Sequence, residues 1–280
     1  MIIAQERGRG GAVSTTFAPG LVAAVWTRDR HPIFALLQSE LSMGVPISFP
    51  FERDKSYPIG DLRRFQAVLS QARQQDRGLS NKIRARELAW AKLCCEELFP
   101  IMLFADHNRL PDDAEFRIMP EGNAVDVELL CSGELTRFQI TTAYPEWDEQ
   151  GHEARDGGYI RALERAGINQ DAPVFGGGQI EKGADGRIVS SPRARSPDID
   201  RDAWHLGLTK AIRSKLAKSE RYSEKVDVLL VYSELLRFNT IDEKTEDVVV
   251  PVILEAVGNS SLPFAKLIIL DHGAYVEYRP

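Results

Sequence analysis

One short stretch, "VDVELLCSGELTRFQITTAY", places two acids, an arginine and a glutamine at alternating positions around a Ser-Gly pair. A two-residue hairpin turn at Ser-Gly sets a register in which Glu128 lies opposite Arg137. The same register sets Asp126 opposite Gln139, so all four polar side chains share one face of the sheet. A cross-strand Glu128–Arg137 pair on a solvated face is ordinary for an antiparallel sheet. Asp126, opposite a neutral amide, is the acid available for chemistry.

A second acid is Glu87, within "LSNKIRARELAWAKLCCEELFP". On a helical wheel of about 100° per residue, Glu87 falls inside an apolar stripe. The stripe consists of Ile83, Trp90, Ala91, Cys94 and Leu98. A buried carboxylate needs a partner, because burial alone raises its pKa or costs several kcal/mol. Two hypotheses stay open: an internal ion pair with an arginine, or a site shared with Asp126 whose oxygens suit Mg²⁺ or Mn²⁺.

A third group lies on the helix predicted for "DRDAWHLGLTKAIRSKLAKSERYSEK". Its buried stripe is expected to be Leu208, Ile212 and Leu216. A broad basic face follows from the same wheel: Lys210, Arg213, Lys218 and Arg221, with Lys215 at its border. A basic helical face is usually only solvated, but it can hold phosphates through charge-assisted hydrogen bonds. The nucleic-acid-binding hypothesis rests on Lys210, Arg213, Lys215 and Lys218.

The elements that would position these groups follow from periodicity and turn residues. Three extended runs, over 115–120, 124–130 and 135–144, predict an antiparallel meander. Helices are expected over 32–44, 59–75, 80–100 and 202–219, with Pro100 ending the third. Further on, "KVDVLLVY" and "AKLIILD" read as buried strands and "VVVPVILEAV" as a helix interrupted near Pro251. The whole predicts a mixed α/β fold.

Composition limits the class of protein. With 280 residues and 43% hydrophobic content, the chain can bury a substantial core. Its net charge of -6 argues against a protein that coats nucleic acid generally, although a local basic patch remains compatible with it. Three cysteines without a CxxC motif indicate neither a disulfide framework nor a zinc site. No run of about 18 apolar residues occurs, so we expect no membrane association and a cytoplasmic location.

The order of helix, three-stranded meander, helix and strand resembles the core of the PD-(D/E)xK, or restriction-endonuclease-like, nuclease superfamily. Its αβββαβ unit sets a helix glutamate, a second-strand aspartate and a third-strand acid-x-Lys around a divalent metal. The resemblance covers roughly residues 80–144 and 202–232. It implies an N-terminal lead and helical subregion over 1–79, and a nuclease-like core over 80–280 with a long insertion at 145–200.

The resemblance also implies roles for individual residues. Glu87 matches the helix glutamate, Asp126 the motif aspartate, and Gln139 the position of the lysine. Mg²⁺ or Mn²⁺ would then be held by Glu87, Asp126 and the backbone carbonyl of Phe138, with Gln139 orienting a water. The ion would polarise a phosphoryl group and lower the pKa of its water.

Arg137 stands where that superfamily carries its third-strand acid, so different classes of function stay open. In the first, Glu128 substitutes for the missing acid if the strand shifts, and the chain is a metal-dependent nuclease, with DNA expected ahead of RNA. In the second, the Arg137 guanidinium replaces the charge of the metal and contacts phosphate directly, which describes a catalytically inactive nucleic-acid-binding module. A protein-interaction module on the same fold is the third. The sequence leaves the oligomeric state open.

Overall fold

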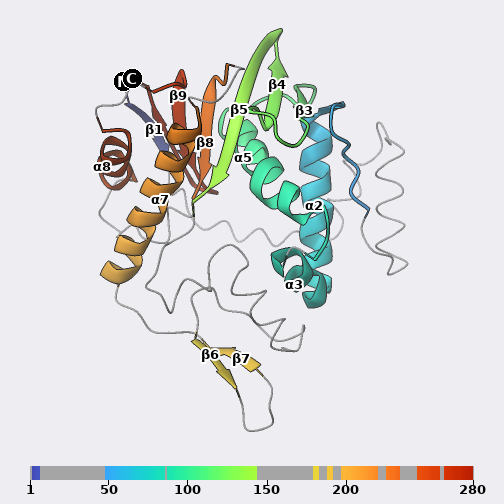
Figure 1. Ribbon diagram of the computed structural model, residues 1–280. Coiled ribbons are helices and arrows are strands. Elements are labelled where there is room, and N and C mark those ends of the chain that lie inside the picture. The colour runs from blue at the N-terminus through green and yellow to red at the C-terminus, as the bar shows by residue number, and fades with distance from the viewer. Residues whose placement is uncertain are drawn as a thin grey trace.

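The computed structural model describes residues 2–6, 48–85, 87–143, 179–182, 188–191, 197–219, 225–233, 245–258 and 262–279. These residues form a mixed α/β fold around an eight-stranded sheet in the order β1-β10-β9-β8-β5-β4-β3-β2 (Figure 1). Its strands are β1 (Ile2–Glu6), β2 (Ser56–Pro58), β3 (Glu115–Ile118), β4 (Val127–Cys131), β5 (Glu134–Thr142), β8 (Val228–Tyr232), β9 (Lys266–Leu270) and β10 (Ala274–Tyr278). A separate antiparallel hairpin joins β6 (Gln179–Lys182) to β7 (Ile188–Ser191).

The antiparallel meander predicted from the sequence is confirmed. β3 pairs with β4, and β4 pairs with β5 in the expected register, with Val127 opposite Phe138 and Glu128 opposite Arg137. Ser132 and Gly133 form the two-residue turn with φ angles of 51° and 83°. Two successive positive φ angles are the requirement of a type I′ hairpin turn, which matches the twist of the strands it joins. This turn therefore sets which side chains of the hairpin share a face.

Two parallel pairings extend the meander into the rest of the sheet. β5 pairs with β8 and β8 pairs with β9, each in parallel. Parallel neighbours need long crossovers, and these contain the helices α7 (Pro197–Ser219) and α8 (Thr245–Val257). The buried strands predicted for "KVDVLLVY" and "AKLIILD" are therefore confirmed as β8 and β9. A helix is also confirmed at "VVVPVILEAV", but the expected interruption near Pro251 is wrong, because α8 runs unbroken from Thr245 to Val257 with Pro251 inside it.

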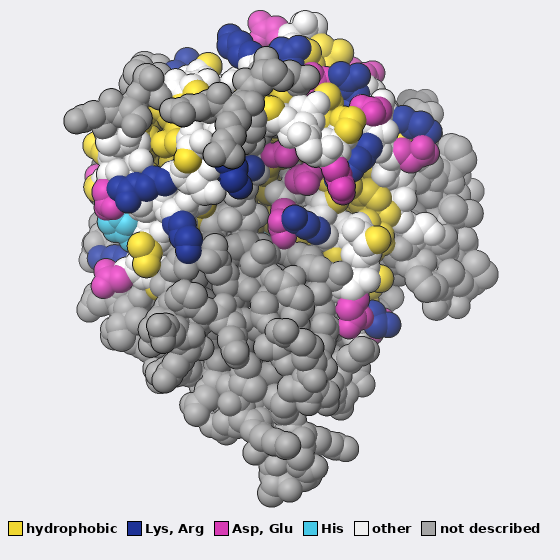
Figure 2. All heavy atoms as spheres, viewed as in Figure 1, with side chains coloured by type: hydrophobic (Ala, Val, Ile, Leu, Met, Phe, Trp, Pro, Cys, Tyr) yellow, Lys and Arg dark blue, Asp and Glu magenta, His cyan; other side chains and the backbone are white. Residues whose placement is uncertain are grey.

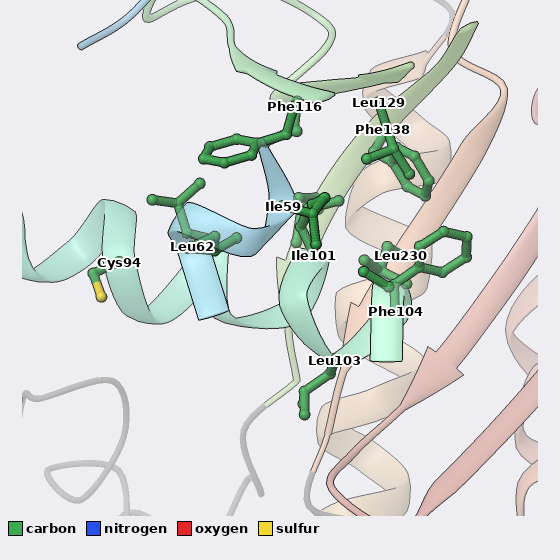
Figure 3. Close-up of a cluster of buried hydrophobic side chains, with 14 of the residues drawn as sticks. Ile59, Leu62, Cys94, Ile101, Leu103, Phe104, Phe116, Leu129, Phe138 and Leu230 are labelled. Carbon is green, nitrogen blue, oxygen red and sulfur yellow. The ribbon is translucent and has the colours of Figure 1, made fainter. Parts of the chain in front are cut away.

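One hydrophobic cluster fills the space between the sheet and the helices α2 (Ile59–Gln75) and α5 (Phe99–His107) (Figure 3). The predicted helix over 59–75 is confirmed. α2 turns residues at three- and four-residue spacing into this cluster, among them Ile59, Leu62 and Phe65, all fully buried. Phe104 meets Phe138 edge to face, with ring centroids 4.9 Å apart. Thus β2 and α2, from the expected N-terminal subregion, share one core with the strands that carry Asp126 and Gln139.

A second cluster lies on the other face of the sheet, under α7 and α8. Leu208 and Ile212 of the predicted stripe are fully buried there, and Leu216 is partly buried against the cluster. Trp204 of the same helix donates a buried hydrogen bond of 2.8 Å from Nε1 to the hydroxyl of Ser233. The prediction that this helix packs on the sheet is therefore confirmed.

The single helix expected over 80–100 is wrong. The chain forms α3 (Arg77–Ala85), a short α4 (Ala91–Leu93), a π-helical turn η1 (Cys94–Leu98) and then α5. Pro100 does not end this run: the amide of Phe99 donates to the carbonyl of Cys94, which closes the wide turn just before the proline. α5 thus begins anew with Pro100 in its first turn, where proline is tolerated because that N–H has no helical partner.

Two of the regions expected from the sequence lie wholly or mostly outside the described part of the chain. The helix expected over 32–44 lies outside the described residues, as does most of the insertion at 145–200. Within the part of the chain that is described, no helix has the length and apolar character needed to cross a membrane.

Candidate functional site

Asp126 lies just before Val127, the first residue of β4, at the end of the regular pairing between β4 and β5. Its amide donates to the carbonyl of Phe138 at 2.8 Å, and its own carbonyl accepts from the amide of Met119 at 2.9 Å. Its carboxylate accepts from the amide of Ile140 at 2.6 Å, through Oδ2. A side-chain oxygen here takes the place of a backbone acceptor, so the Ile140 amide fixes the carboxylate while the backbone of Asp126 is bonded to Phe138 and Met119. Burial nevertheless raises the pKa of Asp126, although the charge of Lys215 and the Ile140 amide oppose that rise.

Glu97 is the acid that the structure brings to Asp126. It lies in the π-helical turn η1 and is partly buried. Burial, followed by the negative charge of Asp126, raises the pKa of Glu97 from 4.5 to about 7. Near neutral pH this carboxyl group is therefore close to the midpoint of its titration. Any cation placed between the two acids would favour the ionised form.

Lys215 is the third member of this group. It lies on α7, in the part of the helix that follows the buried Leu208 and Ile212 at helical spacing. Burial lowers the pKa of the Lys215 ammonium, while the charges of Asp126 and Glu97 raise it. Among the described residues, Lys215 forms no ion pair within 4 Å with Asp126 or with Glu97. We call these three residues, Glu97, Asp126 and Lys215, the Asp126 cluster.

Two further cations act on the Asp126 cluster. The charges of Arg53 and Lys92 lower the pKa of both Glu97 and Asp126. Arg53 is also anchored by a hydrogen bond to the carbonyl of Met119 and by an ion pair of 3.5 Å with Glu121. The site therefore sets two carboxylates among three cationic side chains. Figure 2 shows acidic and basic side chains lying together on the face that α7 covers.

Gln139 and Phe138, expected at the site from the sequence, are fixed within the sheet. Gln139 is buried, and its Nε2 donates to the carbonyl of Ala124 at 3.2 Å. That contact ties the loop before β4 to β5, next to Asp126. The Phe138 carbonyl, expected as a metal ligand, already accepts the amide of Asp126. A role for Gln139 in orienting water and for the Phe138 carbonyl in metal binding stays a prediction.

Glu128 and Arg137 form the cross-strand pair that the hairpin register predicted. Arg137 Nε lies 3.2 Å from Glu128 Oε1, and Arg117 of β3 pairs with Glu128 Oε2 from the other side. The Glu128 side chain is only 8% exposed. Because both of its oxygens are bound to arginines, Glu128 is held in place as a structural anion. The expectation that Glu128 substitutes for a third-strand acid finds no support in this geometry.

Glu87 is not where the helical wheel placed it. It lies between α3 and α4, its side chain is exposed, and its amide donates to the carbonyl of Lys82 at 3.0 Å. The wheel assumed an unbroken helix, whereas α3 ends at Ala85. Ile83, Ala91, Cys94 and Leu98 of the expected stripe are buried nonetheless. The inward placement of Glu87, on which its assignment as a metal ligand rested, is therefore wrong.

The expected basic face of α7 is divided in the structure. Arg213 turns towards α8, where it donates to the carbonyl of Glu255 at 2.9 Å. Lys210 and Lys218 are exposed, Lys215 belongs to the Asp126 cluster, and Arg221 lies outside the described residues. Nucleic-acid binding by Lys210, Arg213 and Lys218 stays a prediction.

Sequence reasoning missed Glu97, although a signal for it exists. Glu97 is three residues after the buried Cys94 and four before the buried Ile101. These spacings put it on the inner side of a helix that runs from about 91 to 107 rather than from 80 to 100. Treating Pro100 as an end removed Ile101 from the wheel, and with it the indication that Glu97 faces inward.

Two partly buried carboxylates with a lysine nearby can hold a divalent cation or the phosphate of a substrate. Among the described residues, no group of three or more His, Cys, Asp or Glu side chains is arranged to share a metal ion. Mg²⁺ needs fewer protein ligands than this, since it keeps several waters and is commonly bound by one or two carboxylates plus substrate phosphates. Comparison with family models, curated proteins and solved structures found no match for this chain.

Proposed function

We propose that this chain is a metal-dependent phosphodiesterase of the nuclease type, a divergent relative of the PD-(D/E)xK superfamily that acts on nucleic acid. The observation that carries the proposal is the Asp126 cluster: an acid at the start of the second meander strand, an acid from the preceding helix and a lysine from the following helix. In this proposal Glu97, and not Glu87, takes the place of the helix glutamate. The third-strand motif remains altered, with Arg137 and Gln139 in its two positions.

The donor set fits Mg²⁺ or Mn²⁺. Asp126 and Glu97 offer hard oxygen ligands, and the charge of Asp126 disfavours ionisation of Glu97 until a cation is present. When bound, such an ion supplies Lewis-acid polarisation of a phosphoryl oxygen and a water of lowered pKa. Asp126 is the better fixed ligand, because the Ile140 amide already orients its carboxylate.

The other residues supply position and charge. Lys215 of α7, which is partly buried within the electrostatic reach of Asp126 and Glu97, would stabilise negative charge that develops on a phosphoryl group. It provides the positive charge that the neutral amide of Gln139 cannot. Arg53 and Lys92 at the rim draw the phosphate backbone towards the site. Gln139 fixes the loop that carries Asp126.

The direct test is cleavage of labelled nucleic acid by the full chain with Mg²⁺, with Mn²⁺ and with EDTA. The substrates are single- and double-stranded DNA and RNA. Cleavage is expected only with metal, and Asp126→Asn is expected to abolish it, because asparagine can still accept the Ile140 amide but carries no charge. Glu134→Gln, an exposed carboxylate at the far end of the hairpin, is the matched control and is expected to cleave normally. Cleavage that persists in EDTA or in Asp126→Asn contradicts the proposal.

A second candidate function is a nucleic-acid-binding module without catalysis. Arg137 at the third-strand acid position favours it, together with the binding of both Glu128 oxygens by arginines. The same experiment separates the two functions, because a binding module would retain labelled nucleic acid and leave it intact in every metal.

A further inference from the structure

A row of three charged side chains crosses the β3–β4–β5 meander on its α7 side, two residues along the chain from Asp126. The register sets Arg117 opposite Glu128 and Glu128 opposite Arg137. Glu128 accepts from Arg117 Nε at 3.1 Å through Oε2 and from Arg137 Nε at 3.2 Å through Oε1. One carboxylate therefore fixes two guanidinium groups on either side of it.

The arginines are far more accessible than the acid that holds them. The Glu128 side chain is 8% exposed, whereas those of Arg117 and Arg137 are 42% and 38% exposed. A guanidinium has five N–H donors. Glu128 takes two of them from Arg117 and one from Arg137, so the remaining donors are left for other acceptors. These three side chains together carry a net charge of one positive unit, and the carboxylate of Asp227 adjoins the row at Arg137, whose amide it accepts at 3.0 Å.

The next row outward is apolar. Leu130 and Leu135 lie opposite each other, and they are 41% and 43% exposed. Glu115 of β3 occupies the same row beyond Leu130. Figure 2 shows hydrophobic and basic side chains together over the meander. We call Arg117, Arg137, Leu130 and Leu135 the arginine–leucine face.

We propose that the arginine–leucine face is a docking surface for the phosphodiester backbone of nucleic acid, in which Glu128 presents Arg117 and Arg137 as a fixed pair of phosphate ligands. The choice of nucleic acid as the occupant rests on the proposed function. Fixed guanidiniums lose less conformational entropy on binding phosphate than free ones do. Asp126 lies two residues along the chain from Glu128, about 7 Å at the rise of a strand. This separation is about that of neighbouring phosphates along a nucleic-acid strand, so a strand held by the arginines can reach the Asp126 cluster, while the leucines contact its sugars and bases.

The experiment measures binding of a short fluorescent DNA duplex, and of its single strand and RNA counterpart, by anisotropy in EDTA over a series of salt concentrations. Arg117→Gln and Arg137→Gln are each expected to lower the slope of log affinity against log salt for the duplex by about 0.9, the loss of one phosphate contact. Each leaves Glu128 paired with the other arginine, so the fold is expected to persist. Arg109→Gln, an exposed arginine in the α5–β3 loop, is the matched control.

Glu128→Gln tests whether binding depends on the fixed positions of Arg117 and Arg137 or only on the charge of the surface. Removing this acid makes the face more positive, so nonspecific attraction would strengthen binding. If Glu128 acts by positioning the arginines, the variant binds several-fold more weakly despite its gain in charge. Thermal unfolding of each variant shows that binding is measured on folded protein.

Three results overturn the inference: unchanged salt slopes in both arginine variants, tighter binding by Glu128→Gln, or no affinity of the native chain for any of the three probes. The proposed function fails separately, through the cleavage assay. Loss of salt slope in the arginine variants of a chain that never cleaves supports the docking surface while refuting the nuclease. Metal-dependent cleavage together with unchanged salt slopes in the arginine variants supports the nuclease and refutes the docking surface.

Discussion

Glu97→Gln is expected to stabilise the protein, and only above the pH at which Glu97 ionises. Burial and the charge of Asp126 raise the pKa of Glu97 from 4.5 to about 7. The folded protein therefore holds this proton more tightly than the unfolded chain does. The free energy of unfolding is consequently greatest below the unfolded-state pKa and falls as pH rises through about 7. Glutamine at this position removes that part of the pH dependence.

The size of the effect follows from the same numbers. A rise from 4.5 to about 7 corresponds to roughly 3.4 kcal/mol, at about 1.36 kcal/mol for each tenfold change in proton affinity. Glu97 is only partly buried, so screening by solvent reduces the expected gain to about 2 kcal/mol. Urea unfolding at about pH 8.5 is expected to show this gain, and unfolding at about pH 5 is expected to show little of it. Glu134→Gln, the exposed control, is expected to change neither.

The same unfolding assay with added Mg²⁺ or Mn²⁺ tests whether Glu97 and Asp126 bind a metal ion or only repel each other. If Glu97 and Asp126 share a divalent cation, Mg²⁺ stabilises the native chain at high pH by an amount that grows with its concentration. Glu97→Gln loses most of that response. A stability difference that is equal at both pH values refutes the assignment of the raised pKa to Glu97. A pH-dependent difference without any response to Mg²⁺ or Mn²⁺ retains the electrostatic pair and refutes the metal site.

Two further predictions concern charge and backbone. Lys215→Met is expected to reduce metal-dependent cleavage about 10²-fold, because it removes a positive group from the site of developing charge. Lys82→Met, which changes an exposed lysine on α3, is the control and is expected to leave kcat unchanged. Single-turnover cleavage measures both variants, and equal activity of the two contradicts a role for Lys215. Gly133→Ala is expected to lower the free energy of unfolding by about 1 kcal/mol, because φ at Gly133 is 83° and an L side chain is strained there. Urea unfolding measures this loss, and a value within error of zero refutes the strain argument.

The parts of the fold that sequence could predict are those in which local pattern and tertiary structure agree. The alternation around Ser132-Gly133 specifies both the turn and the register, so the Glu128–Arg137 pair followed from it. The helix expected over 59–75 is likewise α2, where Ile59, Leu62 and Phe65 recur at three-residue spacing and face the core. Strand β1 shows the opposite case. It pairs with β10 from the other end of the chain, and no local pattern reports a partner that distant.

The site was harder to predict because small changes of helical phase decide which side chain faces inward. A helix that breaks after Ala85 turns Glu87 to solvent, and the π-helical turn before Phe99 sets Glu97 towards Asp126. A wheel of constant 100° steps cannot represent either event. Lys215 stood at the border of the wheel, and packing of Leu208 and Ile212 on the sheet turned it inward.

Glu128 and Asp126 are two residues apart in the sequence, and their surroundings differ in a way that bears on function. Glu128 has an arginine on each oxygen at hydrogen-bond distance, the arrangement of an acid that serves the structure. Asp126 and Glu97 have cations near enough to shift their pKa, yet burial still raises the pKa of both. A buried group of acids whose ionisation is disfavoured lowers the stability of a fold, and such arrangements are concentrated at sites that bind or react. In the proposed function, this contrast assigns the chemistry to Asp126 and gives Glu128 the task of holding Arg117 and Arg137 in place.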